Sequence, residues 1–298
     1  MEFDYMKLLV IGASGFIGGS LYKKALGEGL RAVGTKYLKN GDGLIHFNML
    51  EHEIKDRLPK EFLDEPEDVL AVICSANPLI EECRKHPQES YELNVVSMKR
   101  LFKSLSDLKI RFCFLSTDNV FDGAAGYYDE SEPTCPCNEY GRQKAEIEKF
   151  ILENYSSELI FRLSQTVSDS LEGRNLFNQW NNWCVTKKEI LCIKDNFFAP
   201  TFVGDIYTAA VLAFSRKASG LYNCVNGEHF SREELARQFV RHIFPGIEIK
   251  ITVKPVEEFG FSDKHALRTY LDNTKIVNDL KMRFTSMKTV FRSILARK

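Results

Sequence analysis

Short, largely apolar runs alternate with longer stretches of helical periodicity through the first half of the chain. Lys7 to Ile11 is one such run and ends at a glycine, as expected of a strand that is buried in a parallel sheet. From Phe16 to Leu26 the apolar positions repeat near helical spacing, and Arg31 to Thr35 forms a second short run. Strand, glycine turn, helix and strand, in this order, predict a βαβ unit.

The alternation continues through the next hundred or so positions of the sequence. Three further strand-like runs and two helical stretches cover residues 69–74, 88–105, 110–116, 140–152 and 159–163. In the second of these helices we expect Glu146 and Glu148 to face solvent. The alternation predicts an α/β protein with a Rossmann-type, doubly wound parallel sheet that helices cover on both faces.

Beyond residue 165 the pattern is less regular. The predicted helices and the one predicted strand cover residues 175–187, 205–214, 220–225 (the strand), 231–243 and 287–295. Ser231, followed three positions later by Glu234, is typical of a capping box at a helix start. We expect residues 1–164 to form a dinucleotide-binding domain to which segments near 190–225 return. Residues 165–298 would then form mainly a smaller C-terminal substrate-binding lobe over the carboxyl ends of the strands.

Composition and charge exclude several classes of partner. The 298 residues carry a formal net charge of −1 with scattered Lys and Arg, so we expect no nucleic-acid binding. No run approaches the roughly 20 apolar residues of a membrane helix and no secretory signal is visible, so we expect a cytoplasmic protein with no membrane partner. The eight cysteines fall mostly in apolar runs and lack neighbours at ligand spacing, which predicts reduced thiols and no metal site.

Three glycines at intervals of three residues follow the first predicted strand and open the first predicted helix. Glycine permits a tight turn and a close approach of the backbone to a pyrophosphate, while the helix N-terminus offers free N–H groups. A lone motif of this kind can be a plain glycine turn, but the βαβ context favours dinucleotide binding. The cofactor contacts expected in this loop are Gly12, Ser14, Gly15, Phe16, Ile17 and Gly18.

The end of the second strand bears on the choice between NAD and NADP. An acidic residue there would bind the ribose 2′-hydroxyl of NAD. This chain instead has Thr35 and Lys36, so a 2′-phosphate would be tolerated or attracted. We therefore favour NADP(H) over NAD(H), with both residues as cofactor contacts. The alternative is that Lys36 is an ordinary surface residue.

Tyr140 and Lys144 lie four positions apart in a predicted helix, which places both side chains on one face. A buried ammonium beside a phenol favours the phenolate, so the Tyr could exchange a proton near neutral pH although a free phenol has a pKa of about 10. Thr117 ends a predicted strand at the carboxyl edge of the sheet. These residues predict carbonyl reduction, in which Thr117 bonds the carbonyl oxygen while Tyr140 protonates it.

Three sequence segments carry a family resemblance. They are Ser116-Thr117-Asp118-Asn119-Val120-Phe121-Asp122-Gly123, Pro136-Cys137-Asn138-Glu139-Tyr140-Gly141-Arg142-x-Lys144, and Arg268-x-x-x-Leu271-Asp272. With the glycine loop, they resemble the extended short-chain dehydrogenase/reductases and, within them, the dTDP-4-dehydrorhamnose reductase family. The resemblance implies an enzyme that uses NADPH to reduce the 4-keto group of a nucleotide-linked 6-deoxy sugar.

The same resemblance implies a set of site residues. The catalytic residues would be Thr117, Tyr140 and Lys144. The further cofactor contacts would be Asn48 and Met49 near the adenine, Ser75, Ala76 and Asn94, with Tyr140 and Lys144 again. The substrate contacts would be Asp118, Asn119, Val120 and Arg268. A nucleotide sugar is the expected partner, and the resemblance allows a homodimer.

Three other functions stay open on the sequence. A sugar-nucleotide dehydratase usually has Glu where this chain has Asn119, and an amide can neither accept nor deliver the proton, so we rank that function below reduction. A sugar-nucleotide epimerase would use the same Tyr140 and Lys144. The resemblance also extends to the regulatory subunit of methionine adenosyltransferase, which binds NADP and serves as a partner subunit without turnover.

Overall fold

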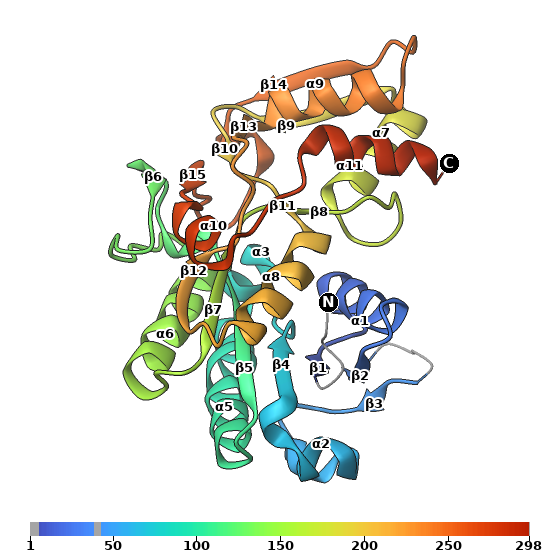
Figure 1. The fold of residues 1–298 in the computed structure, drawn as a ribbon. Helices are drawn as coiled ribbons and strands as arrows, with labels where there is room; N and C mark the ends of the chain where they lie inside the picture. Colours follow the sequence, from blue (N-terminus) through green and yellow to red (C-terminus); the bar gives the residue numbers. More distant parts are fainter. Residues whose placement is uncertain (1–5, 39–42, 298) are drawn as a thin grey trace.

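A parallel sheet of seven strands runs through the lower part of the molecule, with helices on both faces (Figure 1). This computed structural model describes residues 6–38 and 43–297. Residues 1–5, on which the expectation of no secretory signal partly rests, lie outside the described part, as do 39–42 and 298. The strands, in spatial order, are β12 (Gly220–Asn223), β7 (Leu159–Leu163), β5 (Arg111–Thr117), β4 (Val69–Ile73), β1 (Lys7–Ile11), β2 (Arg31–Lys36) and β3 (Ile45–His46).

Every neighbouring pair in this sheet is parallel, which confirms the Rossmann-type α/β prediction. The direction of strand order reverses at β1, with β2 and β3 on one side and the other strands on the opposite side. Ligands of such sheets bind at the carboxyl ends of the strands at this reversal. The loops that follow β1 and β4 meet there, since a Cβ on Gly12 would lie only 2.5 Å from Ser75 Oγ.

Helices from both halves of the chain cover the sheet. One face is packed by α1 (Phe16–Gly27), α8 (Val203–Ser215) and α10 (Thr274–Leu280). The other face is packed by α2 (Lys60–Asp64), α5 (Ser97–Asp107) and α6 (Glu139–Asn154). The single helix predicted at 88–105 is divided into α4 (Pro87–Tyr91), a π-helical turn η3 (Glu92–Val96) and α5, with α3 (Ile80–Lys85) before them. Sequence periodicity does not reveal a π turn because the apolar positions continue across it.

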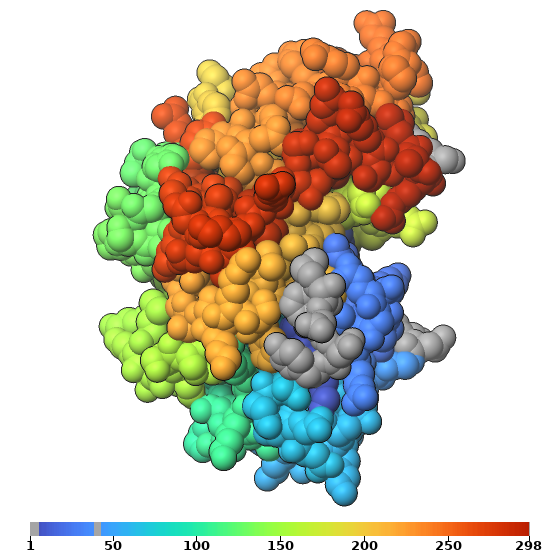
Figure 2. Space-filling view, viewed as in Figure 1, coloured from blue at the N-terminus to red at the C-terminus, as the bar shows by residue number. Residues whose placement is uncertain are grey.

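The upper part of the molecule has its own apolar cluster and three small sheets. The larger one has the order β13 (Phe230–Ser231), β10 (Phe197–Phe198), β15 (Arg268–Leu271) and β6 (Gly126–Tyr128). The smaller two pair β11 (Thr201–Phe202) with β8 (Thr166–Val167), and β14 (Lys250–Lys254) with β9 (Glu189–Ile193). The helices of this part are α7 (Leu176–Lys187), α9 (Arg232–Ile243) and α11 (Met287–Ala296). The orange and red C-terminal part of the chain forms most of the upper surface in Figure 2.

The aromatic core of the upper part joins its three helices. Phe177 of α7 and Phe239 of α9 stack with ring centroids 5.3 Å apart, and Phe291 of α11 lies 5.3 Å from Phe177. Trp180 is fully buried beside them. Ser231 and Glu234 form the predicted capping box at the start of α9. Large apolar rings shared by three helices fix this lobe as one packed unit.

One expectation about α6 is wrong. Glu148 does not face solvent: its carboxylate pairs with Arg162 of β7, with Oε2 2.7 Å from Nη2 and Oε1 3.1 Å from Nε. Both side chains are buried. A charged residue in the middle of a central strand needs a counter-charge from the helix that covers it, because an unpaired buried charge is very costly. In the sequence such a pair looks like two surface charges.

The closest contact in the glycine loop gives a stability prediction. A Cβ on Gly18 would lie 2.3 Å from the Gly12 carbonyl oxygen, so Gly18→Ala forces the loop and α1 apart. We expect it to lower the free energy of unfolding by about 2 kcal/mol or more, measured by urea denaturation. Gly27→Ala is the matched control in the same helix, since no atom lies within 4 Å of its added Cβ. Equal losses in the two variants would contradict the prediction.

Candidate active site

The three predicted catalytic residues are brought together by β5 and the start of α6. Thr117 is the last residue of β5, and Tyr140 and Lys144 lie on the buried face of α6. Asn138 is the N-cap of α6, and its side-chain Oδ1 accepts a hydrogen bond of 2.8 Å from the Gly141 N–H. A Cβ on Gly141 would lie 2.0 Å from the Asn119 carbonyl oxygen, so glycine lets α6 approach the turn after Thr117.

Tyr140 is held as a neutral phenol. Burial raises its pKa, and the nearby carboxylate of Asp118 raises it further. The expected stabilisation of a phenolate by Lys144 is absent from this arrangement: Lys144 Nζ donates to the Leu115 carbonyl oxygen at 2.7 Å and lies 5.9 Å from the Tyr140 ring centroid. The protonated phenol is the form that can give a proton to an alkoxide.

Lys144 is buried against the carbonyl end of β5. Burial lowers its pKa to about 8, although the carboxylate of Glu148 acts in the opposite direction. Its ammonium also lies 4.2 Å from the centroid of the Phe114 ring. A charged lysine in this buried setting lowers the stability of the folded state. Such a cost is typical of a functional residue rather than of one that stabilises the fold.

The burial of Lys144 gives a pH-dependent prediction. Because its pKa is lowered from 10.5 to about 8 on folding, the folded protein holds this proton less readily than the unfolded chain. Below pH 8 this difference destabilises the folded state, and the penalty fades as the pH rises from 8 towards 10.5. We expect Lys144→Met to raise the free energy of unfolding at pH 7 by about 2 kcal/mol, and by less at pH 9.5.

The control for this measurement is Lys149→Met, because Lys149 lies on the same helix but is exposed and pairs with Glu153. Urea denaturation of the wild type and both variants at the two pH values gives the comparison. A Lys144→Met variant that is less stable than the wild type at pH 7 would show that the buried ammonium stabilises the fold.

Asp118 is a buried hydrogen-bond hub. Its Oδ1 accepts from the Thr117 hydroxyl at 3.2 Å and from Asn119 Nδ2 at 3.0 Å. Its Oδ2 accepts from the hydroxyls of Ser164 and Thr269, each at 2.7 Å. Burial raises its pKa, and these four donors counteract the rise. The carboxylate thus joins β5, the end of β7 and β15 of the upper part of the molecule.

This arrangement changes the interpretation of two predicted substrate contacts. Asp118 is engaged by the protein itself, which favours a structural role over contact with a substrate. Val120 is fully buried and packs with Phe121 and Tyr128. Both side chains point into the protein because the 3-10 turn η4 (Asp118–Val120) folds under α6. Consecutive polar and apolar letters in the sequence do not reveal that turn.

The hub gives a second stability prediction. Asp118→Ala would leave three hydroxyls and the Asn119 amide without their acceptor, and we expect a loss of about 2 to 4 kcal/mol in the free energy of unfolding. Asp118→Asn is the control, because its oxygen can still accept from Asn119 while its NH2 donates to Ser164 and Thr269. We expect the Asn variant to unfold within about 1 kcal/mol of the wild type. An Ala variant as stable as the wild type would refute the structural role.

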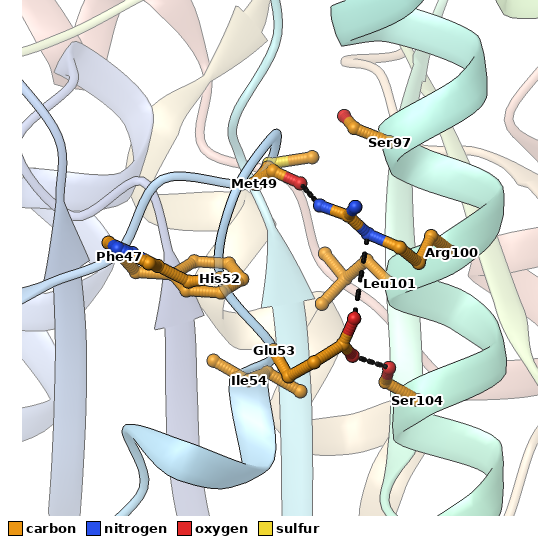
Figure 3. A pocket seen from close by; sticks show the side chains of 9 residues that line it. All are labelled: Phe47, Met49, His52, Glu53, Ile54, Ser97, Arg100, Leu101 and Ser104. Carbon is orange, nitrogen blue, oxygen red and sulfur yellow. Dashed lines mark hydrogen bonds and ion pairs between the residues drawn. The ribbon is translucent and has the colours of Figure 1, made fainter.

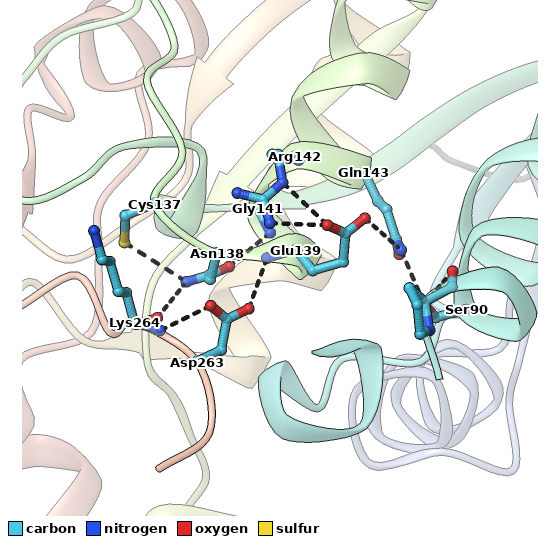
Figure 4. Close-up of polar contacts among 10 residues, drawn as sticks. Ser90, Cys137, Asn138, Glu139, Gly141, Arg142, Gln143, Asp263 and Lys264 are labelled. Carbon is cyan, nitrogen blue, oxygen red and sulfur yellow. Dashed lines mark hydrogen bonds and ion pairs between the residues drawn. The ribbon is translucent and has the colours of Figure 1, made fainter. Parts of the chain in front are cut away.

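Asn119 continues the network from the hub to the upper part of the molecule. Its Nδ2 bonds Asp118, and its Oδ1 accepts from Asn138 Nδ2 at 3.1 Å. Asn138 Nδ2 also donates to the Lys264 carbonyl oxygen at 3.1 Å, and Asp263 accepts from the N–H of Glu139 at 3.0 Å (Figure 4). The segment 263–264 is therefore bonded to the helix turn that carries Tyr140. Asn138 was not among the predicted site residues, although Asn just before a helix is a typical N-cap.

The glycine loop fits a pyrophosphate. Gly12 has φ +89°, which favours glycine, and Gly15 is the N-cap of α1 without any side-chain cap. Gly15 is exposed, and its neighbours Ser14, Phe16 and Ile17 are half-buried, so the N–H groups at this helix start lie at the surface. An uncapped helix N-terminus at the strand reversal suits an anion. Ser75 and Ala76, also half-buried, lie beside it after β4.

Other predicted cofactor residues hold the loops around this crevice. Thr35 Oγ1 accepts from the Gly12 N–H at 3.0 Å, and is buried. Asn94, in the π-helical turn, accepts from the Asn77 N–H at 2.8 Å and donates to Gln143 Oε1 at 2.7 Å. Figure 4 shows Gln143 reaching from α6 towards Ser90. These hydrogen bonds hold the loop after β4 against α6. The π-helical turn therefore has a structural role next to the candidate site.

The segment after β3 packs against α5 around a small pocket (Figure 3). Arg100 donates to the Met49 carbonyl oxygen, and its Nε lies 3.8 Å from Glu53 Oε1. Asn48 is buried and accepts from the Leu50 N–H at 3.1 Å. Asn48 and Met49 thus lie in an ordered segment beside β2. Lys36 ends β2, in register with His46 of β3.

Arg268 is not brought to the catalytic residues by its contacts. It is exposed and lies over the Phe197 ring at 5.8 Å, whereas the next residue, Thr269, points inward to Asp118. Adjacent residues of a β-strand point to opposite faces of the sheet, so Arg268 points away from the face on which Thr269 meets Asp118.

The model of the family described as RmlD substrate binding domain matches residues 6–298. The chain belongs to this family. Its fold is the Rossmann-like α/β fold of RmlD-type proteins, and the family, together with a reductase among its relatives, indicates an oxidoreductase-type enzyme.

Two curated relatives of this RmlD-family chain span most of its length. It is 25% identical over 222 residues to the probable low-salt glycan biosynthesis reductase Agl14 of Haloferax volcanii, covering 73% of this chain and 74% of that protein. It is 24% identical to the spore coat polysaccharide biosynthesis protein SpsK of Bacillus subtilis, covering 85% and 84%. Methionine adenosyltransferase 2 subunit beta of Bos taurus is 28% identical, but the match covers 53% of this chain and about half, 46%, of that protein.

Solved structures agree on the fold. A dTDP-4-dehydrorhamnose reductase of Bacillus anthracis in complex with NADP superposes with a TM-score of 0.85 at 18% identity, covering 98% of this chain and 99% of that one. A UDP-glucose 4-epimerase of Thermotoga maritima reaches 0.80 at 17% identity, covering 98% of each chain. At such identity the likeness establishes the fold alone. Within the described ranges, no helix is long and apolar enough to cross a membrane.

Proposed function

We propose that this protein reduces the 4-keto group of a nucleotide-linked 6-deoxy sugar with NADPH. The observation that carries the proposal is the buried, neutral Tyr140 beside Thr117 and Lys144, at the carboxyl edge of a Rossmann-type sheet. A neutral phenol is a proton donor, which suits reduction. The relative described as a probable low-salt glycan biosynthesis reductase supports the same direction.

In the proposed reaction, the glycine loop from Gly12 to Gly18 would hold a reduced nicotinamide cofactor, which would supply the hydride for the carbonyl carbon. Tyr140 gives its proton to the oxygen as negative charge develops there. The Thr117 hydroxyl, which donates to Asp118 over a long 3.2 Å contact, can rotate to donate to the same oxygen. Lys144, one helical turn beyond Tyr140, would serve as a cofactor contact, because its ammonium is bonded to the Leu115 carbonyl oxygen and lies 5.9 Å from the Tyr140 ring centroid.

The cofactor and the lobes have proposed assignments too. We favour NADPH because β2 ends in Thr35 and Lys36, and no acidic residue stands there to bind a 2′-hydroxyl. Residues 165–298 would form mainly the substrate-binding lobe, while α8 and β12 serve the dinucleotide-binding part. A cytoplasmic location fits eight unpaired cysteines, which suit a reducing compartment.

A second candidate is an NADP-binding partner subunit without turnover. It is favoured by the likeness to methionine adenosyltransferase 2 subunit beta, which covers about half of each chain. A carbonyl-reduction assay separates the two functions, since a partner subunit would bind NADPH and leave the sugar unchanged.

The test is oxidation of NADPH, followed by absorbance, with a dTDP-linked 4-keto-6-deoxy sugar and product identified by mass and NMR. We expect Tyr140→Phe to lower kcat by about 100-fold or more while the affinity for NADPH is retained. Tyr155→Phe, at the far end of α6, is the matched control and should keep full activity. The same assay with NADH should give a lower kcat/KM.

Turnover by Tyr140→Phe at the wild-type rate would refute the catalytic assignment. NADPH binding without turnover on any 4-keto sugar nucleotide would favour the partner-subunit function. An equal kcat/KM with NADH would refute the NADP preference.

A further inference from the structure

Arg232 has an unusual environment for an arginine. It is the first residue of α9, and its guanidinium donates to two side-chain amide oxygens: Nε to Asn196 at 2.7 Å and Nη2 to Gln165 at 3.3 Å. It also lies over the Phe198 ring at 5.5 Å. No carboxylate of the described residues lies within ion-pair distance of it, whereas buried Arg162 is paired with Glu148.

The surroundings of Arg232 disfavour its charge. The Arg232 side chain is half-buried, and this burial lowers the pKa of its guanidinium. Nη1 has no hydrogen-bond partner among the described residues, yet it is not one of the buried atoms sealed off without a partner. A half-buried cation with neutral acceptors on one side and an open donor on the other is stabilised by an anion from solution.

The acids nearest in sequence are already engaged. Glu233 pairs with Arg237 at 2.6 Å, and Glu234 accepts from the Ser231 N–H in the capping box. The guanidinium is instead held by neutral amides from two other segments. Asn196 bonds the arginine at two points, because its backbone carbonyl oxygen also accepts a hydrogen bond of 2.8 Å from the backbone N–H of Arg232. The positive end of the helix dipole at this first turn adds to the attraction for an anion.

Arg232 is connected to the catalytic residues by a short path. Gln165, which accepts from Arg232, follows Ser164 in the chain, and Ser164 donates to Asp118. Asp118 follows Thr117, so two hydrogen bonds and two peptide links separate the guanidinium from the catalytic hydroxyl. In a nucleotide sugar the diphosphate is attached to C1, across the pyranose ring from C4. A sugar nucleotide with C4 at Thr117 would carry its diphosphate away from this hydroxyl, and the hydrogen bonds through Ser164 and Gln165 join Asp118, the neighbour of Thr117, to an anion site at Arg232.

We propose that Arg232, with its guanidinium fixed by Asn196 and Gln165, binds a phosphate group of the sugar-nucleotide diphosphate. The inference rests on the proposed function for the identity of the ligand. A planar guanidinium bonds two phosphate oxygens at once, which a lysine cannot do. Arg268, the arginine that the sequence suggested, is exposed over Phe197 and lacks this setting. Arg232 would therefore select substrates that carry a diphosphate.

The test compares Arg232→Gln with Arg237→Gln, an exposed arginine of the same helix. We expect Arg232→Gln to raise KM for the dTDP-linked 4-keto sugar by about 30-fold, with kcat at saturation and KM for NADPH within about 3-fold of the wild type. Arg232→Lys should recover part of the loss, because it restores the charge without the planar fork. Arg237→Gln should leave all three constants unchanged. Inorganic pyrophosphate should inhibit the wild type competitively against the sugar nucleotide, and Arg232→Gln weakly.

An unchanged KM in Arg232→Gln, or an equal rise in Arg237→Gln, would overturn the inference, as would an equal rise in KM for NADPH. If the Gln variant does not fold, the Lys variant and pyrophosphate inhibition of the wild type provide the same decision. Binding of dTDP, measured by calorimetry, separates this inference from the proposed function. If the wild type shows no turnover, the proposed function fails. A roughly 10-fold weaker binding of dTDP by Arg232→Gln would still support the phosphate site, and equal binding would overturn it.

Discussion

The buried carboxylate of Asp118 is the interaction on which the site depends. Its two oxygens accept hydrogen bonds from Thr117 of β5, from Ser164 just after β7 and from Thr269 of β15, so one side chain joins the sheet to the upper part of the molecule. Neither part alone could satisfy it, because Thr269 comes from one and Ser164 from the other. A buried acid without these donors would be costly, and the two parts are therefore held in one relative position. Thr117, which we propose as a catalytic hydroxyl, is the residue next to this junction.

The sequence predicts the parts of the structure that follow from local chemistry. Apolar runs such as 69–74 are strands because both faces of a parallel sheet are buried, and Gly12 and Gly18 mark a turn where no Cβ fits. Thr117, Tyr140 and Lys144 could be grouped because the helix period and the strand ends place them at one edge. Each of these inferences uses neighbours that are close in the chain.

Residues that depend on distant neighbours could not be predicted. Glu148 resembled a solvated charge until β7 supplied Arg162, and Asp118 resembled a substrate contact until β15 supplied Thr269. Arg232 carries no local signal, since its two amide acceptors, Asn196 and Gln165, come from other segments. The pattern of the chain predicts which groups can react. The pairing of buried charges, which needs the whole fold, decides which groups are structural.

The edge strand β12 has a consequence for how the chain folds. Its residues 220–223 pair with β7, and α8, at 203–215, covers the face of the sheet that α1 also covers. The seven-stranded sheet, whose first strand begins at residue 7, is therefore complete only after residues 220–223 have been synthesised. Contacts of such long sequence separation are slow to form. A chain that is still being synthesised would expose the unpaired edge of β7 during that interval, and exposed apolar strand edges are prone to aggregation.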